Sequence, residues 1–311
     1  MQCKLAGVFW RLVGWLDNER YQPPANATDV SIDWWRVFPF VLLHIALFGL
    51  LWVGWSPFAV GFAIVMYLIR MFAITGFYHR YFAHKTFQTS RFGQFLFGLI
   101  GATAVQRGPL WWAAHHRAHH VHADQAEDIH SPHQHGFLWS HLGWFLSHAN
   151  FHTRLDRVKE LAKFPELRLL DRFDSLMPLL LAVAIYALGT LLESTAPALE
   201  TNGLQLLEWG FVISTIALYH ATFCVNSLAH VWGSRRYQTR DHSRNNLLIA
   251  LLTLGEGWHN NHHHFPGSAK QGFYWWEIDF TYYGLRLLAA MGIIWNVKRV
   301  PVHVREQRPS S

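Results

Sequence analysis

Four long apolar runs limit what this chain of 311 residues can fold into. The runs cover approximately residues 37–53, 58–77, 176–192 and 209–225. A helix crosses a bilayer with about 20 mostly apolar residues, and each run approaches that length. Only GWSP separates the first two runs, so we expect a hairpin, and the last two form a second pair. The sequence therefore predicts an all-α integral membrane protein with four transmembrane helices in two hairpins.

The composition agrees with a membrane protein. Half of the residues are apolar (51%), only 15% are charged, and 16 are tryptophan, whereas about a quarter of the residues in a soluble domain are charged. The formal charge of +6 is spread over residues beside the apolar runs. Such residues suit anionic lipid headgroups better than a nucleic acid. We therefore expect membrane lipid as a partner and no nucleic acid.

The positions of Lys and Arg predict the orientation. Both hairpin tips lack these residues, whereas residues 79–175 and the segment after residue 226 are rich in them. Positive charge stays on the cytoplasmic side, so both segments and both termini are expected there. The chain divides into a cytoplasmic or interfacial N-terminal segment (1–36), a main domain (37–300) and a C-terminal tail (301–311).

Clustered histidines are the chemical signature of the chain. Two runs, HHRAHH (115–120) and HNNHHH (259–264), space three histidines by three and four residues, which on one helical face lets them converge on a metal. HRYFAH (79–84) and NSLAH (226–230) add three more. The nine clustered residues are His79, His84, His116, His119, His120, His230, His259, His262 and His263. Nine imidazoles exceed the needs of one ion, so the sequence predicts two.

Two alternatives to a catalytic metal centre were weighed. The 22 histidines could be scattered over surface loops, but the same spacing recurs, and charged His pairs would repel one another without a metal. The chain could also be a non-redox metal-binding membrane protein or transporter. Transporters usually place their ligands at mid-membrane depth, whereas these clusters lie beyond the ends of the runs. A cytoplasmic helical cap that holds a di-metal site is therefore favoured.

The runs HRYFAH, HHRAHH and HNNHHH, in this order and with apolar pairs between them, resemble the three histidine boxes of membrane fatty-acyl desaturases. NSLAH, SHLGW and GEGWHNNHHHFP resemble the stearoyl-type branch, which places a double bond between carbons 9 and 10. The resemblance covers approximately residues 35–300. It implies that the nine histidines hold two iron ions, with Asn226 reaching one of them through a water. His115 and His264 adjoin the boxes and are expected to be neighbours.

The resemblance also implies roles around the metals. Trp112 and Thr222 correspond to the bend of an acyl tunnel, with Gln106 near its mouth; an interfacial aromatic position is the alternative for Trp112. Asp128 and Glu256 are candidate carboxylates that hold histidine tautomers, with a solvated charge as the alternative. Arg107 is expected at the mouth, where the acyl headgroup docks.

The implied reaction is the O2-dependent formation of a cis double bond in a saturated C16–C18 acyl chain. Iron fits this chemistry because zinc is redox-inert, although zinc could replace iron on overexpression. Coenzyme A, acyl carrier protein and phospholipid stay open as acyl carriers. Electrons would come from a separate ferredoxin, rubredoxin or cytochrome. A membrane hydroxylase or alkane monooxygenase with similar histidine clusters is the alternative enzyme.

Overall fold

The structure is a computed structural model that describes residues 15–20 and 30–307. Most of the predicted N-terminal segment and the last four residues of the tail lie outside these ranges. Helices dominate the described residues, and one two-stranded sheet pairs β1 with β2 antiparallel, Gln88 opposite Trp295. The α-helices and strands are α2 (Trp34–Ala46), α3 (Leu50–Val53), α4 (Pro57–Phe72), β1 (Gln88–Thr89), α5 (Arg91–Ala102), α6 (Pro109–His122), α7 (Pro132–His135), α8 (Pro165–Arg172), α9 (Leu176–Thr195), α10 (Gly203–Leu207), α11 (Ser214–Asn226), α12 (Leu247–Leu252), α13 (His259–His264), α14 (Phe280–Ala290), β2 (Ile294–Trp295) and α15 (Val302–Arg305).

Segments of π-helix and short 3-10 turns extend or connect several of these helices. The π-helical segments are η3 (Ala73–Ala83), η4 (Trp139–Gly143) and η9 (Glu208–Ile213). The 3-10 turns are η1 (Asn18–Arg20), η2 (Leu47–Gly49), η5 (Trp144–Leu146), η6 (His148–Asn150), η7 (Leu155–Arg157), η8 (Pro197–Leu199) and η10 (Leu228–His230).

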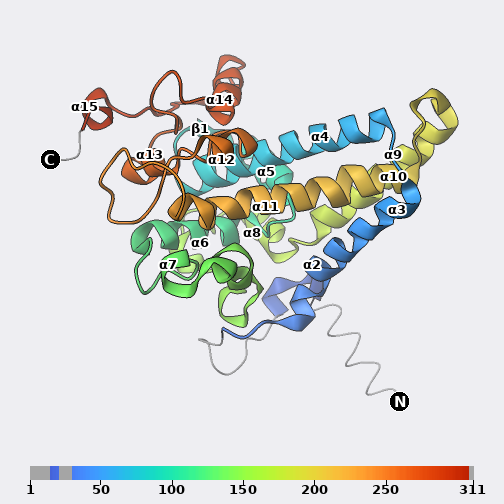
Figure 1. The fold of residues 1–311 in the computed structure, drawn as a ribbon, viewed down its shortest axis with the longest axis horizontal. Coiled ribbons are helices and arrows are strands. Elements are labelled where there is room, and N and C mark those ends of the chain that lie inside the picture. Colours follow the sequence, from blue (N-terminus) through green and yellow to red (C-terminus); the bar gives the residue numbers. More distant parts are fainter. Residues whose placement is uncertain (1–14, 21–29, 308–311) are drawn as a thin grey trace.

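Among the described residues, four continuous helices are long and apolar enough to cross a membrane, as the sequence predicts. They are Trp34–Val53, Pro57–Ala83, Leu176–Thr195 and Gly203–His230. Figure 1 shows them extending from one side of the molecule, with the shorter helices gathered at the other side as a cap. The large apolar side chains along the spans are exposed, for example Leu51 at 78%, which is the surface that lipid covers.

The first hairpin turns within three residues. Gly54 has a φ of 63°, a left-handed conformation that glycine adopts without a Cβ clash. Ser56 then caps α4, because its Oγ accepts a hydrogen bond from the Ala59 N–H at 3.1 Å, and Pro57 occupies the first turn. The predicted turn at residues 54–57 is confirmed.

Two polar residues inside the spans, Arg70 and His220, are hydrogen-bonded within the protein. Arg70 is fully buried and donates to the hydroxyl of Thr215 at 2.6 Å and to the hydroxyl of Ser214. His220 lies between His44 (Nε2 to Nε2, 3.4 Å) and His141 of the cap (Nδ1 to Nε2, 3.1 Å). These bonds offset the cost of placing polar groups at membrane depth and connect the spans to the cap.

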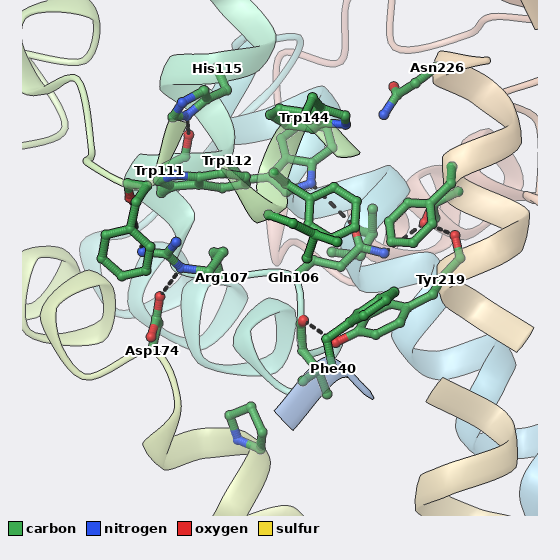
Figure 2. Close-up of a pocket in the computed structure, with 18 of the residues that line it drawn as sticks. Phe40, Gln106, Arg107, Trp111, Trp112, His115, Trp144, Asp174, Tyr219 and Asn226 are labelled. Atoms are coloured by element: carbon green, nitrogen blue, oxygen red, sulfur yellow. Dashed lines mark hydrogen bonds and ion pairs between the residues drawn. The ribbon is translucent and has the colours of Figure 1, made fainter. Parts of the chain in front are cut away.

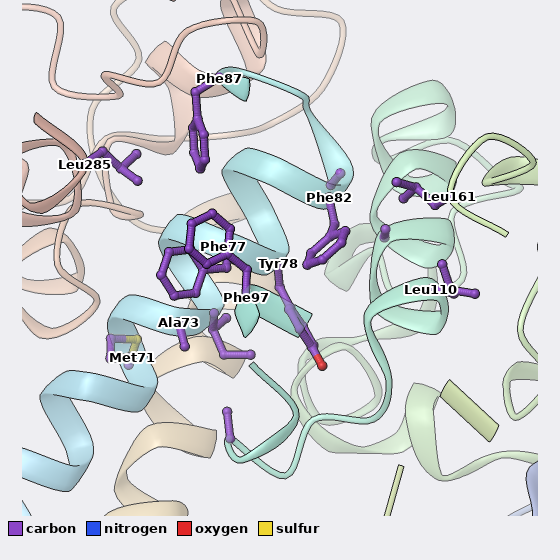
Figure 3. Close-up of a cluster of buried hydrophobic side chains, with 14 of the residues drawn as sticks. Met71, Ala73, Phe77, Tyr78, Phe82, Phe87, Phe97, Leu110, Leu161 and Leu285 are labelled. Atoms are coloured by element: carbon purple, nitrogen blue, oxygen red, sulfur yellow. The ribbon is translucent and has the colours of Figure 1, made fainter. Parts of the chain in front are cut away.

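An aromatic core joins the second span to the cap (Figure 3). The rings of Phe77 and Phe97 stack at 3.9 Å, which packs η3 against α5. Tyr78 and Phe82 of η3 and Leu110 of α6 are buried in the same cluster. Burying each such side chain contributes roughly 1.5–3 kcal/mol. This packing holds η3 and α6 together, and both carry clustered histidines.

Candidate metal centre and acyl cavity

Five of the nine clustered histidines converge in one place, which we call group A. It consists of His79, His84, His116, His120 and His262, whose candidate ligand nitrogens lie within 4.8 Å of one another. The Nε2 atoms are 3.0 Å apart between His79 and His262, 2.8 Å between His84 and His116, and 2.9 Å between His120 and His262. Five ring nitrogens thus point toward a common centre.

The other four clustered histidines form group B. It consists of His119, His230, His259 and His263, again within 4.8 Å of one another. The Nε2 atoms of His230 and His259 are 3.0 Å apart, and Nε2 of His263 is buried without a hydrogen-bond partner. The structure therefore brings all nine predicted histidines into two adjacent groups.

Helix geometry divides each histidine triplet between the two groups. The spacing of each triplet predicts that its three histidines lie on one face and can converge on a metal, whereas in the structure each triplet is divided between the two groups. In α6, His116 and His120 belong to group A and His119 to group B. In α13 the pattern is reversed, with His259 and His263 in group B and His262 in group A. At 3.6 residues per turn, residues i and i+4 are about 40° apart, whereas residue i+3 lies about 60° to the other side, so each helix supplies both groups.

A π-helical turn positions the first box. His79 lies in η3, and His84 immediately follows it. The N–H of His84 bonds to the carbonyl of His79 at 3.2 Å, which is the i→i+5 bond of a π-helix. This turn places two residues five apart on the same face, where an α-helix would separate them.

Three carboxylates orient group B. The Nδ1 atoms of His119, His230 and His263 bond to Asp128 (3.0 Å), Asp124 (2.8 Å) and Asp241 (2.9 Å). Burial raises the pKa of these carboxyl groups, but the histidine bonds and nearby N–H or O–H donors outweigh it, so the pKa of each lies below its ordinary value. An ionised carboxylate accepts a hydrogen bond from Nδ1–H, which keeps the proton on Nδ1 and leaves Nε2 bare as a ligand.

One carboxylate orients group A. Glu256 contacts Nδ1 of His79 and also pairs with Arg80, 3.2 Å from Nη2. Arg80 in turn pairs with Asp279 at 2.9 Å, and Asp279 caps α14 by accepting from the Tyr282 N–H. Among the described residues, this is the only group A histidine with a carboxylate on Nδ1.

The donor set fits two metal ions. Burial is the largest cause that lowers the pKa of His84, His116 and His262 well below the ordinary value, and neighbouring histidines lower it further. Burial also lowers the pKa of His263 to about 4, against the opposing effect of Asp241. These imidazoles are therefore neutral at pH 7, as metal ligation requires. Bare nitrogens about 3 Å apart, one of them buried without a partner, suit a cation between them.

An apolar cavity of about 560 Å³ leads to the histidine groups. Its inner wall includes His79, His116, His119, His259 and Asn226. Figure 2 shows Asn226 at the end of its helix on the border of this space. The remaining wall is largely apolar and comes from spans and cap alike, including Phe40, Leu43, Ile74, Phe145, Tyr219 and Phe223. Asn226 thus shares the cavity with two members of group B.

Three predicted tunnel residues form one hydrogen-bonded set across this cavity. The amide of Gln106 donates to the Thr222 hydroxyl at 2.7 Å and accepts from the Trp112 indole at 3.4 Å. The Trp112 ring stacks on the ligand candidate His116, with centroids 5.0 Å apart. The set therefore connects the cavity wall of α11 to α6 and to group A.

Arg107 lies at the outer part of the same cavity. Its Nε bonds to Asp174 at 2.5 Å (Figure 2). Its guanidinium lies over the rings of Phe151 (4.1 Å) and Trp111 (5.1 Å). A carboxylate therefore already balances its charge. His115 and His264 belong to neither histidine group, and they bond to the carbonyls of Trp111 and Val304.

Sequence reasoning missed two carboxylates of group B. Asp124 and Asp241 lie outside all three histidine boxes, and Asp124 is 106 residues away from its partner His230. Their position within histidine-rich cap segments is the only signal that the sequence offers. Gln271, which bonds to Glu256 at 3.1 Å, was also missed.

Comparisons with known proteins agree with this geometry. The model of the family described as "Fatty acid desaturase" matches residues 53–296, which is most of the chain. The chain belongs to the fatty acid desaturase family. It is 36% identical to the sn-1 stearoyl-lipid 9-desaturase of Anabaena variabilis, over 88% of this chain and 97% of the relative. It is 37% identical to the chloroplastic palmitoyl-monogalactosyldiacylglycerol delta-7 desaturase of Arabidopsis thaliana, over 88% and 72%.

An icosanoyl-CoA 5-desaturase of Limnanthes douglasii is 34% identical over 86% of this chain and 72% of the relative. The protein is therefore a fatty-acyl desaturase, and its described residues include four apolar helices of membrane-spanning length. The names of these relatives differ in double-bond position and acyl carrier.

Proposed function

We propose that this desaturase forms a cis double bond between carbons 9 and 10 of a saturated C16–C18 acyl chain, with two iron ions and O2. The observation that carries the proposal is the juxtaposition of both histidine groups with a largely apolar cavity. The overall reaction converts –CH2–CH2–, O2, two electrons and two protons into –CH=CH– and two waters. Bound iron supplies the redox chemistry with O2 that no side chain provides.

The protein residues position the acyl chain and exclude bulk water from the reacting carbons. The apolar walls hold an extended acyl chain and keep bulk water away from the reacting carbons. The Gln106–Thr222 bond closes one side of the cavity and Trp112 forms the wall beside His116, so these residues determine which methylene groups lie near the metals. We propose that group A and group B each hold one iron, with Asn226 reaching the group B iron through a water.

We further propose that the acyl chain arrives on a membrane lipid. Arg107 is paired with Asp174 rather than available to a polyphosphate, and the relative from Anabaena variabilis is named for a stearoyl-lipid substrate. The arrangement of basic segments supports a cytoplasmic position for the cap and both termini. Electrons then come from a separate soluble carrier protein.

The test is a product analysis. The purified, iron-loaded protein receives a reduced electron donor, O2 and stearoyl groups on phospholipid, galactolipid, coenzyme A or acyl carrier protein in turn. We expect a 9,10-monoene from a lipid-bound chain. Turnover of stearoyl-CoA alone would overturn the carrier, a hydroxylated product would favour a hydroxylase, and metal binding without O2-dependent product would favour a non-redox metal protein.

A further inference from the structure

A stack of aromatic rings begins directly beside group B. His264 follows the ligand candidate His263, and its ring stacks on that of Tyr237 with centroids 4.0 Å apart and planes 5° from parallel. Tyr237 is only 3% exposed. Neither residue belongs to a histidine group or to the acyl cavity, so the function proposed above does not account for this stack.

The stack continues to the surface of the cap. The hydroxyls of Tyr237 and Tyr274 both donate to the carbonyl of Arg305, at 2.7 and 3.1 Å. The Tyr274 ring stacks on Trp276, with centroids 4.7 Å apart, and Trp276 is 52% exposed. Aromatic groups therefore follow one another from His264, the chain neighbour of the group B residue His263, to an exposed indole. Electron tunnelling falls steeply across gaps between groups, and ring contacts or a shared hydrogen-bond acceptor join the successive members of this series.

The surface around Tyr274 is basic. The guanidinium carbon of Arg236 lies 4.5 Å from the Tyr274 ring centroid and that of Arg305 lies 5.5 Å from it. Nζ of Lys270 is 3.4 Å from the Tyr274 carbonyl. Burial lowers the pKa of Lys270, whereas Asp279 and Glu277 raise it and the nearby Arg299 and Arg305 lower it. Lys270 therefore lies within electrostatic reach of both arginines and of two carboxylates.

Few carboxylates offset these cations. Glu277 pairs with Arg236 and is buried, and Glu306 pairs with Arg305. Lys298 and Arg299 are exposed next to these cations, where the Lys298 carbonyl accepts from the Ala269 N–H. The residues that we name the basic face are Arg236, Lys270, Lys298, Arg299 and Arg305. Their excess positive charge attracts an acidic partner and accelerates its encounter.

The basic face points away from the spans. It includes part of α15, which Figure 1 shows at the end of the molecule opposite the turn between α9 and α10. A water-soluble protein can therefore reach it without contacting the bilayer.

We propose that an acidic one-electron carrier protein, with an iron–sulfur or haem group, docks on the basic face, and that Tyr274, Tyr237 and His264 conduct its electrons toward group B. This inference rests on the proposed function, because only a redox metal centre needs reduction. Each encounter oxidises the carrier by one electron. Two encounters supply the two electrons that the desaturation reaction consumes with O2 and two protons.

Docking is tested without reference to the metals. The full chain in neutral-lipid nanodiscs is titrated with plant-type [2Fe–2S] ferredoxin as the acidic probe, at low and high salt. Because rim charges control encounter, Arg299→Glu combined with Arg305→Glu should weaken binding by about tenfold or more at low salt. The matched control, Lys159→Glu with Lys163→Glu, changes the same number of exposed charges elsewhere on the cap and should leave binding unchanged. Equal binding by both variants, or an effect seen only with anionic lipid, would overturn the docking face.

Conduction is tested on the iron-loaded protein by stopped-flow oxidation of reduced ferredoxin. Tyr237→Leu removes the ring between His264 and Tyr274 and should slow electron transfer several-fold, while Tyr237→Phe keeps the ring and the wild-type rate. Dithionite, which is small and needs no docking, should reduce both variants equally and thereby shows that they are folded and loaded. Equal ferredoxin rates would overturn the route alone. A wild-type protein whose metal dithionite cannot reduce would instead contradict the proposed function.

Discussion

The two histidine groups differ in their ligands and in the residues behind them. Group A has five histidines, of which His79 alone contacts a carboxylate among the described residues. Group B has four histidines, three of which bond to Asp124, Asp128 and Asp241. A carboxylate on Nδ1 makes the opposite nitrogen a stronger donor. Group B therefore has one histidine fewer than group A, but its carboxylates make its Nε2 atoms stronger donors, and Asn226 lines the cavity beside it.

The largest effect is expected from the loss of a ligand in either group. His120→Ala in group A and His263→Ala in group B should each abolish desaturation, because each removes a nitrogen from a small closed donor set. Metal analysis should then show about one ion lost per chain, from a protein that stays in the membrane. His264→Ala is the control for the metal count of His263→Ala, since it keeps both groups complete. Near-normal unsaturated product from either ligand variant would show that the groups do not hold the catalytic metals.

The carboxylates provide the next largest effect and separate the groups. Asp124→Asn and Asp241→Asn should reduce metal affinity or activity by roughly 10–100-fold, the usual range for partners of ligating histidines. Glu256→Gln should reduce the affinity of group A in the same range and leave group B loaded. Competition with a chelator, followed by metal counting, measures both. If Asp241→Asn released the group A metal first, the assignment of carboxylates to groups would be wrong.

The sequence predicted those features of the fold and the metal centre that depend on residues close together in the chain. The apolar runs predicted four spans, and the spacing within boxes identified nine histidines that the structure gathers, because helix periodicity is local information. The hydrogen bond between His230 and Asp124 joins residues 106 positions apart, so local sequence periodicity does not predict it. The sequence also does not predict the π-helical segment η3 that contains His79, because η3 packs against α5 and α6 and this tertiary packing is not encoded in local periodicity.

A smaller effect is expected where the cavity meets group A. Thr222→Trp fills the cavity and removes the hydroxyl that accepts from Gln106, and Trp112→Ala removes the ring that stacks on His116. Both should lower activity or move the double bond, because the acyl chain then presents different carbons. Mass spectrometry of derivatised products gives the position. Leu51→Ala, on an exposed lipid-facing surface, is the control; unchanged 9,10 placement and rate in both cavity variants would refute their role.

The smallest effect concerns pH and the metal-free protein. His263 has a folded-state pKa of about 4, below its ordinary value of 6.5. A lowered pKa of this kind means that the unfolded state takes up a proton first as the pH falls. The free energy of unfolding should therefore be constant above pH 6.5 and should fall between pH 6.5 and 4, by about 1.4 kcal/mol per pH unit for each such histidine. Thermal unfolding of chelator-treated protein measures the slope. A stability that rises on acidification through this window would contradict buried neutral imidazoles.

The most direct test of two unequal metal sites is Mössbauer spectroscopy of protein loaded with 57Fe, combined with iron and protein quantification. We expect two irons per chain and two signals of equal area, one from five histidines and one from four histidines with a position open to water. A single iron per chain, or two irons with one indistinguishable signal and mainly sulfur or carboxylate ligation by X-ray absorption, would contradict this account.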